Sequence, residues 1–375
     1  MKIVQWAMPY LPIMGGREVF VHRLASSLAE RGHEVTVLAP DFKGATLDSL
    51  PSEESSFRVV RLPLSGLFVE GRAVEARAAT ALAASALQAA APDVVHAHNV
   101  GPDLMVLREA MTRSRVVPPI ALTVHGLPLT MDSGRWSIAR YAERVVDAVV
   151  AVSEATLAEI AMRAPALGER LVLVRNGVPL PVDPPAAQPL MRALLVFGRL
   201  STEKGVACLL VAFSILLASE PEWRLVVAGD GPERAGLERL ARHLGISDHV
   251  EFTGWLDQAS LLERLRECLL VAVPSIWDEP FGLVAAEAHA AARAVLATRT
   301  GALPEIVQDG ETGWLVPPGD PVALASVLRS VAEDPAIAVA HGQRARARAE
   351  QEFGWNGCVT AYERLYERLA VGGGR

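Results

Sequence analysis

The stretch PLPVDPPAAQP, residues 179–189, holds five prolines in eleven positions. Proline fixes one backbone torsion and has no amide hydrogen to donate, so this density excludes a helix or a central strand. On either side of the stretch, short apolar runs alternate with helix-length amphipathic segments. We therefore predict a linker here with one domain on each side, which agrees with the usual domain size for a chain of 375 residues.

The apolar runs predict the type of each domain. Six runs precede the linker and five follow it, and each is succeeded by a turn and usually by a helix. The runs are residues 2–8, 34–39, 57–62, 93–97, 120–124 and 148–152, then 192–197, 223–228, 250–253, 269–273 and 295–297. Such alternation is typical of parallel sheets with helices on both faces. The predicted fold class is α/β, with two Rossmann-like domains facing a central cleft.

The predicted domains have the following limits. Residues 1–180 form an N-terminal Rossmann-like domain on the acceptor side, 181–189 the Pro-rich linker, and 190–354 a C-terminal Rossmann-like domain for the donor. Residues 355–375 form a last helix and a flexible tail. Tyr362, Leu365, Tyr366 and Leu369 lie on one side of this helix. We expect that side to cross back onto the first domain.

Composition and charge exclude several classes of protein. The chain is 51% hydrophobic and 21% charged, which is typical of a globular protein. Its three cysteines form no C-x-x-C pair, no apolar run reaches the roughly 20 residues of a membrane span, and no signal core opens the chain. A net charge of −7 argues against broad nucleic-acid binding. We expect a cytoplasmic protein whose membrane contact is at most peripheral.

A fold of two open α/β sheets joined by a hinge is compatible with three kinds of ligand-binding protein: a nicotinamide enzyme, a periplasmic-type binding protein and a nucleotide-sugar enzyme. The G-x-G-x-x-G fingerprint of dinucleotide binding is absent from both glycine-rich turns, at Gly15-Gly16 and at Gly229-Asp230-Gly231. A periplasmic binding protein would need an export signal. The nucleotide-sugar enzyme is therefore favoured.

The stretch FGRLSTEKG, residues 197–205, places two cations at a predicted strand-to-helix junction. Arg199 offers a planar fork of donors and Lys204 a point charge, and both lie beside glycines, Gly198 and Gly205. Such a turn can hold a diphosphate. Two solvated surface cations would give the same pattern.

The stretch PSIWDEPFGLVAAEAHA, residues 274–290, carries two acidic residues with seven others between them. Glu279 lies in a loop after a predicted strand, and Glu287 lies on a helix that begins near Leu283. An acid flanked by alanines is costly to bury without hydroxyl or cationic partners. A ligand or an internal ion pair could supply those partners.

In this combination the chain resembles the retaining glycosyltransferases of family 4, the glycogen-synthase-like group 1 enzymes with the GT-B fold. The resemblance covers nearly the whole chain. Its motifs stand in the family's order: Gly15-Gly16-Arg17-Glu18, His96-Ala97-His98, Thr123-Val124-His125-Gly126, Asn176-Gly177-Val178, Gly198-Arg199 with Lys204-Gly205, Gly229-Asp230-Gly231-Pro232, and Glu279-Pro280-Phe281-Gly282 with Glu287-Ala288. The most specific of these is the pair of glutamates.

The resemblance implies a role for each matching residue. The catalytic set is His125, Glu279, Arg199 and Lys204; the donor-binding set is Gly15, Gly16, Gly198, Gly231, Phe281, Gly282, Leu283 and Glu287. Arg199 and Lys204 hold the diphosphate, Glu287 binds the ribose hydroxyls, and Glu279 and His125 face the transferred sugar. The acceptor-side candidates are His96, His98 and Asn99. The two histidines could also be metal ligands, but lining of the cleft is favoured.

The implied reaction transfers a hexose-type sugar from a nucleotide-diphosphate sugar, with UDP favoured and GDP next, to an acceptor hydroxyl with retention of configuration. The acceptor is a saccharide, a lipid-linked saccharide or a small aglycone. Because no Asp-x-Asp occurs in the chain, we expect no metal and no other cofactor. The alternatives are an epimerase or phosphorylase of the same fold, and a non-catalytic sugar-nucleotide binder.

Overall fold

The computed structural model describes residues 1–8, 10–11, 15–41, 56–64, 73–98, 101, 103–126, 144–183 and 192–372, with the backbone alone at 73–76. It divides into two compact units. One consists of Met1–Arg175 with Cys358–Arg375, and the other of Asn176–Gly357. The division therefore falls ahead of the predicted linker at 181–189, of which residues 184–189 lie outside the described part.

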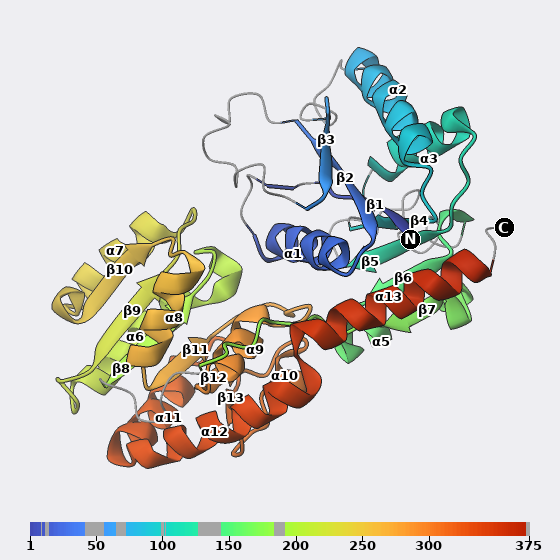
Figure 1. Ribbon diagram of the computed structural model, residues 1–375. Coiled ribbons are helices and arrows are strands. Elements are labelled where there is room, and N and C mark those ends of the chain that lie inside the picture. Colours follow the sequence, from blue (N-terminus) through green and yellow to red (C-terminus); the bar gives the residue numbers. More distant parts are fainter. Residues whose placement is uncertain are drawn as a thin grey trace. The chain divides into compact units, whose positions relative to one another are not determined.

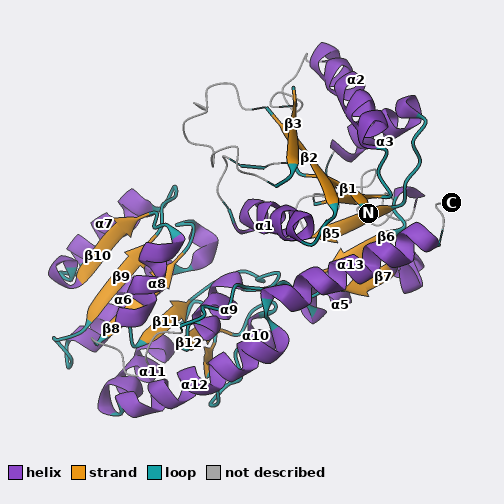
Figure 2. Ribbon diagram, viewed as in Figure 1, coloured by secondary structure: helices purple, strands orange, loops and turns teal. Residues whose placement is uncertain are grey.

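The first unit is built on a seven-stranded parallel sheet of order β3-β2-β1-β4-β5-β6-β7. The strands are β1 (Lys2–Trp6), β2 (Glu34–Pro40), β3 (Arg58–Leu62), β4 (Val94–Ala97), β5 (Ile120–Val124), β6 (Ala148–Ala151) and β7 (Leu171–Leu173). The helices are α1 (Gly16–Glu30), α2 (Ala73–Ala90), α3 (Asp103–Ser114) and α5 (Glu154–Arg163), with a short 3-10 helix at Pro165–Arg170 (Figures 1 and 2).

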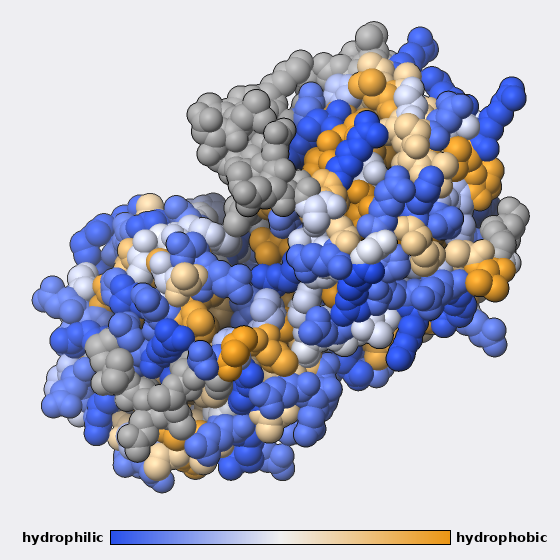
Figure 3. Space-filling view, viewed as in Figure 1, coloured by the Kyte–Doolittle hydropathy of each residue, from blue (hydrophilic) through white to orange (hydrophobic). Residues whose placement is uncertain are grey.

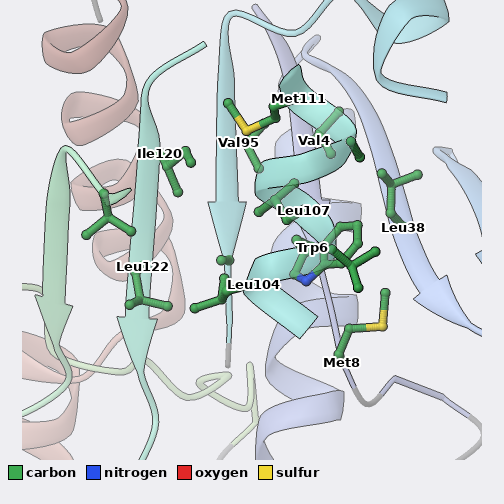
Figure 4. Close-up of a cluster of buried hydrophobic side chains, with 14 of the residues drawn as sticks. Val4, Trp6, Met8, Leu38, Val95, Leu104, Leu107, Met111, Ile120 and Leu122 are labelled. Carbon is green, nitrogen blue, oxygen red and sulfur yellow. The ribbon is translucent and has the colours of Figure 1, made fainter. Parts of the chain in front are cut away.

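A large part of the core of this unit lies between the sheet and the helices α2 and α3. Figure 4 shows Leu104, Leu107 and Met111 of α3 directed at the side chains of β1 and β4. Trp6 is fully buried there, and its indole Nε1 donates a 2.9 Å hydrogen bond to Asp103. The carboxylate therefore satisfies the one polar group of a large buried side chain, which fixes the start of α3 on the sheet.

The second unit has a six-stranded parallel sheet of order β10-β9-β8-β11-β12-β13. Its strands are β8 (Ala193–Phe197), β9 (Arg224–Ala228), β10 (Val250–Gly254), β11 (Leu270–Val273), β12 (Ala294–Thr298) and β13 (Gly313–Val316). Its helices are α6 (Val206–Leu217), α7 (Arg234–His243), α8 (Gln258–Glu267), α9 (Leu283–Ala290), α10 (Leu303–Ile306), α11 (Pro321–Glu333) and α12 (Pro335–Glu352), with 3-10 turns at Thr202–Lys204 and Ser247–His249. Two doubly wound parallel sheets confirm the predicted α/β class.

The last helix, α13 (Trp355–Val371), begins in the second unit and belongs from Cys358 onward to the first. Its buried residues are Cys358, Val359, Tyr362, Leu365 and Tyr366. The Tyr362 hydroxyl lies 3.1 Å from Thr123 Oγ1 at the end of β5. This contact confirms that the C-terminal helix returns to the N-terminal domain.

The described helices include none that is both long and apolar enough to cross a membrane. On the face shown in Figure 3, hydrophilic residues cover most of the described surface, and hydrophobic residues form small patches between them.

Candidate functional site

The predicted donor residues of the second unit gather at one edge of its sheet. Gly198 and Arg199 follow β8, Gly231 follows β9, and Glu279 follows β11. Since β9, β8 and β11 are neighbours in a parallel sheet, their carboxyl ends open on the same side. Ligands of open α/β sheets bind at that edge.

The loop after β8 is held against the loop after β11. Gly205 has a φ of +66° and ends the 3-10 turn Thr202–Lys204, and a Cβ there would overlap the carbonyl of Pro274. The Ile276 amide also donates a 2.9 Å hydrogen bond to the Glu203 carbonyl. A glycine at this position thus allows the two loops to touch, which brings Lys204 beside Glu279.

Lys204 and Glu279 form an ion pair. The Lys204 Nζ donates a 2.6 Å hydrogen bond to Glu279 Oε1, and the side chains are 31% and 8% exposed. Ser275 donates a second bond of 2.6 Å to the same oxygen. The ammonium also lies 5.4 Å from the centroid of the Trp277 ring. The buried carboxylate is therefore partnered, and the cation is fixed in position.

Arg199 and Lys204 share a second carboxylate. Glu203 accepts a 2.6 Å hydrogen bond from Ser201. Desolvation raises the pKa of Glu203, but the bonds from Ser201 and a backbone amide and the charges of Lys204 and Arg199 outweigh it, so the pKa is lower than usual. Both cations thus act on one spot of the turn, although Arg199 itself is exposed.

The turn after β12 fixes the backbone of Glu279. The Ala302 amide donates a 2.8 Å hydrogen bond to the Glu279 carbonyl, and the Gly301 amide donates a 3.1 Å bond to Asp278. Gly301 has a φ of +50°, and a Cβ there would overlap the backbone of Asp278 and Glu279. The lack of a side chain at Gly301 therefore allows the turn after β12 to contact the acidic loop.

Helix α9 begins at this loop. Its N-cap is Gly282, with a φ of +97° and no side-chain cap, and Leu283 is its first residue. The first amides of a helix carry a partial positive charge that favours an anion. Phe281 is buried, and its ring lies 6.0 Å from that of Phe353. Glu287 is half-buried one turn into the helix, on the same face as Leu283.

In the first unit, the predicted residues centre on the start of α1 and the end of β5. Gly16 is the first residue of α1, and Gly15 is its N-cap without a side-chain cap. Glu18 is buried and pairs at 2.9 Å with Arg17. Burial of the ring lowers the pKa of His125 to about 3, and the positive charge of Arg17 is the second cause of this shift. Phe20 of α1 also lies 5.2 Å from the His125 ring, so the start of α1 and the end of β5 are close to each other.

His125 and two buried histidines, His96 and His98, belong to one hydrogen-bonded network. His98 Nδ1 lies 3.1 Å from His125 Nε2, and His98 Nε2 lies 2.5 Å from Gln5 Oε1. His96 bonds to the Tyr366 hydroxyl at 2.6 Å and to Thr123 at 2.7 Å. Burial is the main cause that holds the pKa values of His96 and His98 well below the usual range, and for His98 the charge of Arg17 adds to it. All three rings are therefore neutral at pH 7.

This network changes the interpretation of the acceptor-side candidates. His96 is fully buried and both of its ring nitrogens are occupied, so it fixes α13 to the sheet and does not line a surface. His98 is 1% exposed and forms a hydrogen bond with His125. Asn99 lies outside the described residues. Tyr366 of α13 contacts both His96 of β4 and Gln5 of β1, which accounts for the burial of His96.

Sequence reasoning missed several partners. Ser275 and Trp277 flank the Lys204–Glu279 pair, and Gln5 and Tyr366 complete the histidine network. A polar Gln5 inside an otherwise apolar strand was the available signal for the second group. Within the described ranges, no three His, Cys, Asp or Glu side chains lie close enough together to hold a metal ion.

Comparison with known proteins gives matches over the whole length. The family model "Glycosyltransferase Family 4" matches residues 14–181, and "Glycosyl transferases group 1" matches residues 190–349. The chain is 30% identical to the glycogen synthase of Mycobacterium tuberculosis H37Rv, over 98% of this chain and 94% of the relative. It is 28% identical to the phosphatidyl-myo-inositol mannosyltransferase of Mycolicibacterium smegmatis, over 97% and 93% of the two chains.

Solved structures agree on the fold. Sucrose-phosphate synthase from Thermosynechococcus elongatus superposes with a TM-score of 0.82, at 22% identity and 99% coverage of both chains. Anabaena HepE in complex with UDP and glucose gives a TM-score of 0.77, at 23% identity, with 98% of this chain and 99% of that chain covered. Both share the arrangement of two parallel sheets with interleaved helices.

Proposed function

Because the chain belongs to the family 4, group 1 glycosyltransferases with the two-domain GT-B fold, we propose that it is a retaining, metal-independent hexosyltransferase. Its donor class is a sugar nucleotide. We propose a UDP-sugar first and a GDP-sugar next. The acceptor is a hydroxyl of a saccharide, a lipid-linked saccharide or a small aglycone; the relatives named above include a glycogen synthase and a mannosyltransferase for phosphatidylinositol.

The observation that carries this proposal is the ion pair between Lys204 and Glu279 at the carboxyl edge of the sheet. An ammonium has three donor hydrogens, and one is used at 2.6 Å on Glu279. Within the described residues the ammonium makes no other hydrogen bond, so two hydrogens are left for phosphate oxygens. Glu279 thus holds the Lys204 ammonium in position while leaving it able to bind phosphate. Arg199 adds a planar guanidinium group from the same turn.

In the proposed mechanism, the bond from the anomeric carbon to the diphosphate breaks while the bond to the acceptor oxygen forms on the same face of the sugar. The acceptor proton passes to the departing phosphate oxygen. Negative charge grows on that phosphate, and Lys204, Arg199 and the N-terminus of α9 at Gly282 stabilise it. These groups would replace the metal ion that other diphosphate sites use.

We propose the roles of the remaining site residues from the resemblance to the family. Glu287 binds the ribose hydroxyls, and Glu279 turns its second carboxylate oxygen to the transferred sugar. The amide of Gly16 and the ring of His125 serve the donor from the first domain. Gly198, Gly231, Phe281 and Leu283 shape the backbone on which the nucleotide rests.

The test is donor-dependent transfer in the presence of a chelator. Thermal-shift screening with UDP, GDP, ADP and their glucose or mannose derivatives selects the donor, and release of free diphosphate is then followed with and without an oligosaccharide or inositol-lipid acceptor. The proposal expects release only when acceptor is added, and the same rate with a chelator present. Release without acceptor contradicts transfer, and activity restored only by magnesium or manganese contradicts metal independence.

A further inference from the structure

Arg61 lies near the carboxyl end of β3, on the face of the sheet opposite α2 and α3. Its neighbours Val60 and Leu62 pack into the core that those two helices cover, so the alternation of side chains along a strand directs Arg61 to the other face. There its guanidinium carbon lies 5.5 Å from the centroid of the Tyr10 ring, and the Tyr10 hydroxyl lies 2.8 Å from His22 Nδ1 of α1. The guanidinium therefore lies over a buried ring that α1 holds in place.

One nitrogen of Arg61 fixes the side chain to the carboxyl edge of the sheet. Nη1 donates hydrogen bonds of 2.8 Å to the Leu11 carbonyl and 3.2 Å to the Pro40 carbonyl. Leu11 follows β1 and Pro40 ends β2, so both contacts lie where the carboxyl ends of β1, β2 and β3 meet. Ligands of open α/β sheets bind at such an edge.

The other two nitrogens of the guanidinium are unused. The two carbonyls occupy both hydrogens of Nη1, while Nε and Nη2 make no hydrogen bond or ion pair within the described part of the chain. Nε and Nη2 form one edge of the planar group, which can bind two oxygens of a phosphate or a carboxylate side by side. Arg61 thus presents a complete pair of donors to a ligand.

Arg293 shows how an arginine with a purely structural role is bonded in this protein. Its Nε, Nη1 and Nη2 each donate to a backbone carbonyl, those of Leu265, Ala292 and Arg266. Arg61 uses one nitrogen in this way and leaves two unused. Anchoring of the side chain therefore accounts for Nη1 but not for the open edge.

The charge of Arg61 is not balanced by an acid. The residue is half-buried, and desolvation lowers the pKa of its guanidinium. The nearby Tyr10 hydroxyl is neutral at pH 7, because burial raises its pKa. Among the described residues, no carboxylate forms an ion pair with Arg61. Since a partly desolvated cation without a counter-ion is unfavourable, an anion at the open edge would be stabilised there.

We propose that the Nε and Nη2 edge of Arg61 binds an oxyanion that the acceptor carries in addition to the hydroxyl that receives the sugar. The acceptor is then a phosphorylated or carboxylated molecule and not a neutral sugar. A soluble sugar phosphate and a phospholipid headgroup offer the same oxyanion chemistry to a guanidinium. This inference rests on the proposed function, in which the first domain is on the acceptor side.

Calorimetry tests the site without any transfer reaction. The probes are glucose 6-phosphate, glucuronate and glucose, and the donor site is filled with a saturating nucleoside diphosphate. At least one anionic probe should bind about 10- to 100-fold more tightly than glucose, the range expected for hydrogen bonds to a charged group. Equal affinities for all three probes, together with no gain on the vesicles described below, overturn the proposal.

Matched variants show whether Arg61 causes the preference. Arg61→Gln should abolish it, and Arg58→Gln should keep it, because Arg58 is exposed on the same strand and its loss changes the net charge equally. Arg61→Lys keeps the charge without the planar pair of donors, so it should retain only part of the preference. The same preference in Arg61→Gln and Arg58→Gln overturns the proposal. If Arg61→Gln does not fold, an undiminished preference in Arg61→Lys overturns it.

Vesicles distinguish the two sources of the oxyanion. Co-sedimentation is compared for phosphatidylcholine vesicles with and without phosphatidylinositol. A gain that Arg61→Gln loses and Arg58→Gln keeps identifies a lipid headgroup, whereas a preference among the soluble probes alone identifies a soluble acceptor. Absence of binding by every nucleotide sugar contradicts the proposed function instead, and the same titrations without nucleotide then decide whether Arg61 binds an oxyanion.

Discussion

Lys204 donates a 2.6 Å hydrogen bond to Glu279, a residue 75 positions further along the chain. The two come from loops after neighbouring strands, β8 and β11, and Ser275 donates to the same carboxylate oxygen. The pair joins a proposed phosphate-binding cation to a proposed sugar-binding acid. Each is therefore a determinant of the other's position, and the two should not behave independently in mutants.

Lys204→Ala should lower kcat/KM by roughly 30- to 1,000-fold, which corresponds to about 2–4 kcal/mol of lost transition-state stabilisation. Arg199→Ala should fall in the same range. The matched control is Arg192→Ala, because Arg192 precedes the same strand and forms an exposed surface pair with Glu220 at 3.3 Å. Such a pair contributes little. Steady-state kinetics that show normal turnover in both loop variants would place the phosphate site elsewhere.

Gly301→Ala should reduce activity through the acidic loop. The new Cβ would overlap the backbone of Asp278 and Glu279, so the loop must shift. Gly310→Ala is the control, because Gly310 also has a positive φ, +77°, but open space around its Cβ position. Both variants should lose about 1–2 kcal/mol of unfolding free energy from backbone strain at a positive φ. Only Gly301→Ala should also lose activity, because only there must the acidic loop shift. Denaturant titration and kinetics on the two proteins make the comparison.

Tyr366→Phe should destabilise the protein by about 1–3 kcal/mol, because His96 Nδ1 and Gln5 Nε2 lose the hydroxyl that partners them inside the core. Arg364→Ala on the exposed face of α13 serves as the control, with an expected change within about 0.5 kcal/mol. Urea unfolding measures both. Equal stabilities of the two variants would mean that the histidine network does not hold α13 to the sheet.

Most of this architecture could be predicted from the sequence, because each pattern predicts one kind of local structure. Hydrophobic runs predict strands, glycines predict turns, and the Pro-rich stretch predicts a linker. The strands that escaped prediction are β7 and β13, and both are edge strands. β7 has three half-buried residues, and β13 begins with Gly313 and Trp314. Neither run is long enough for a period of two residues to be recognised.

The residues of the candidate site could be predicted only one by one. Arg199, Lys204 and Glu279 could be found from their turns, but the ion pair between two of them depends on the strand order β8-β11, which no local pattern encodes. The same holds for His96. Its motif indicated a position lining the cleft, and only the return of α13 places Tyr366 against it. Contacts between distant segments are set by the packing of whole elements.

Acid should destabilise the protein from about pH 6.5 downward. Burial lowers the pKa of His125 and of His289 to about 3, so in this range the unfolded chain binds more protons than the folded one. Above pH 6.5, the pKa of histidine in the unfolded chain, these rings do not lower the free energy of unfolding. Between pH 6.5 and pH 3 the free energy of unfolding falls by up to about 1.4 kcal/mol per pH unit for each such histidine. Urea unfolding at a series of pH values measures the slope. His289→Leu should reduce that slope by one histidine's share, and an unchanged slope would contradict burial as its cause.

The two glutamates of the acidic motif should fail in different ways. Glu287 is proposed to bind the ribose in the ground state and the transition state alike, so Glu287→Ala should weaken binding of the plain nucleoside diphosphate as well as of the donor. Glu279 faces the sugar, and it also holds Lys204 at 2.6 Å. Glu279→Ala leaves that cation free for phosphate, so diphosphate affinity should be kept or improved while kcat falls.

Calorimetry with the plain diphosphate separates the two positions, and Glu279→Gln refines the second. The amide keeps an oxygen for the Ser275 bond of 2.6 Å but removes the charge that fixes Lys204. If charge is what matters, Glu279→Gln should resemble Glu279→Ala in kcat; if the hydrogen bond alone matters, it should resemble the wild type. Loss of diphosphate binding in Glu279→Ala, with normal binding in Glu287→Ala, would reverse the two assignments. Proton NMR of the first product completes the experiment, because retained configuration in the wild type and in Glu279→Ala is expected from attack on the same face of the sugar, whereas an inverted product contradicts that mechanism.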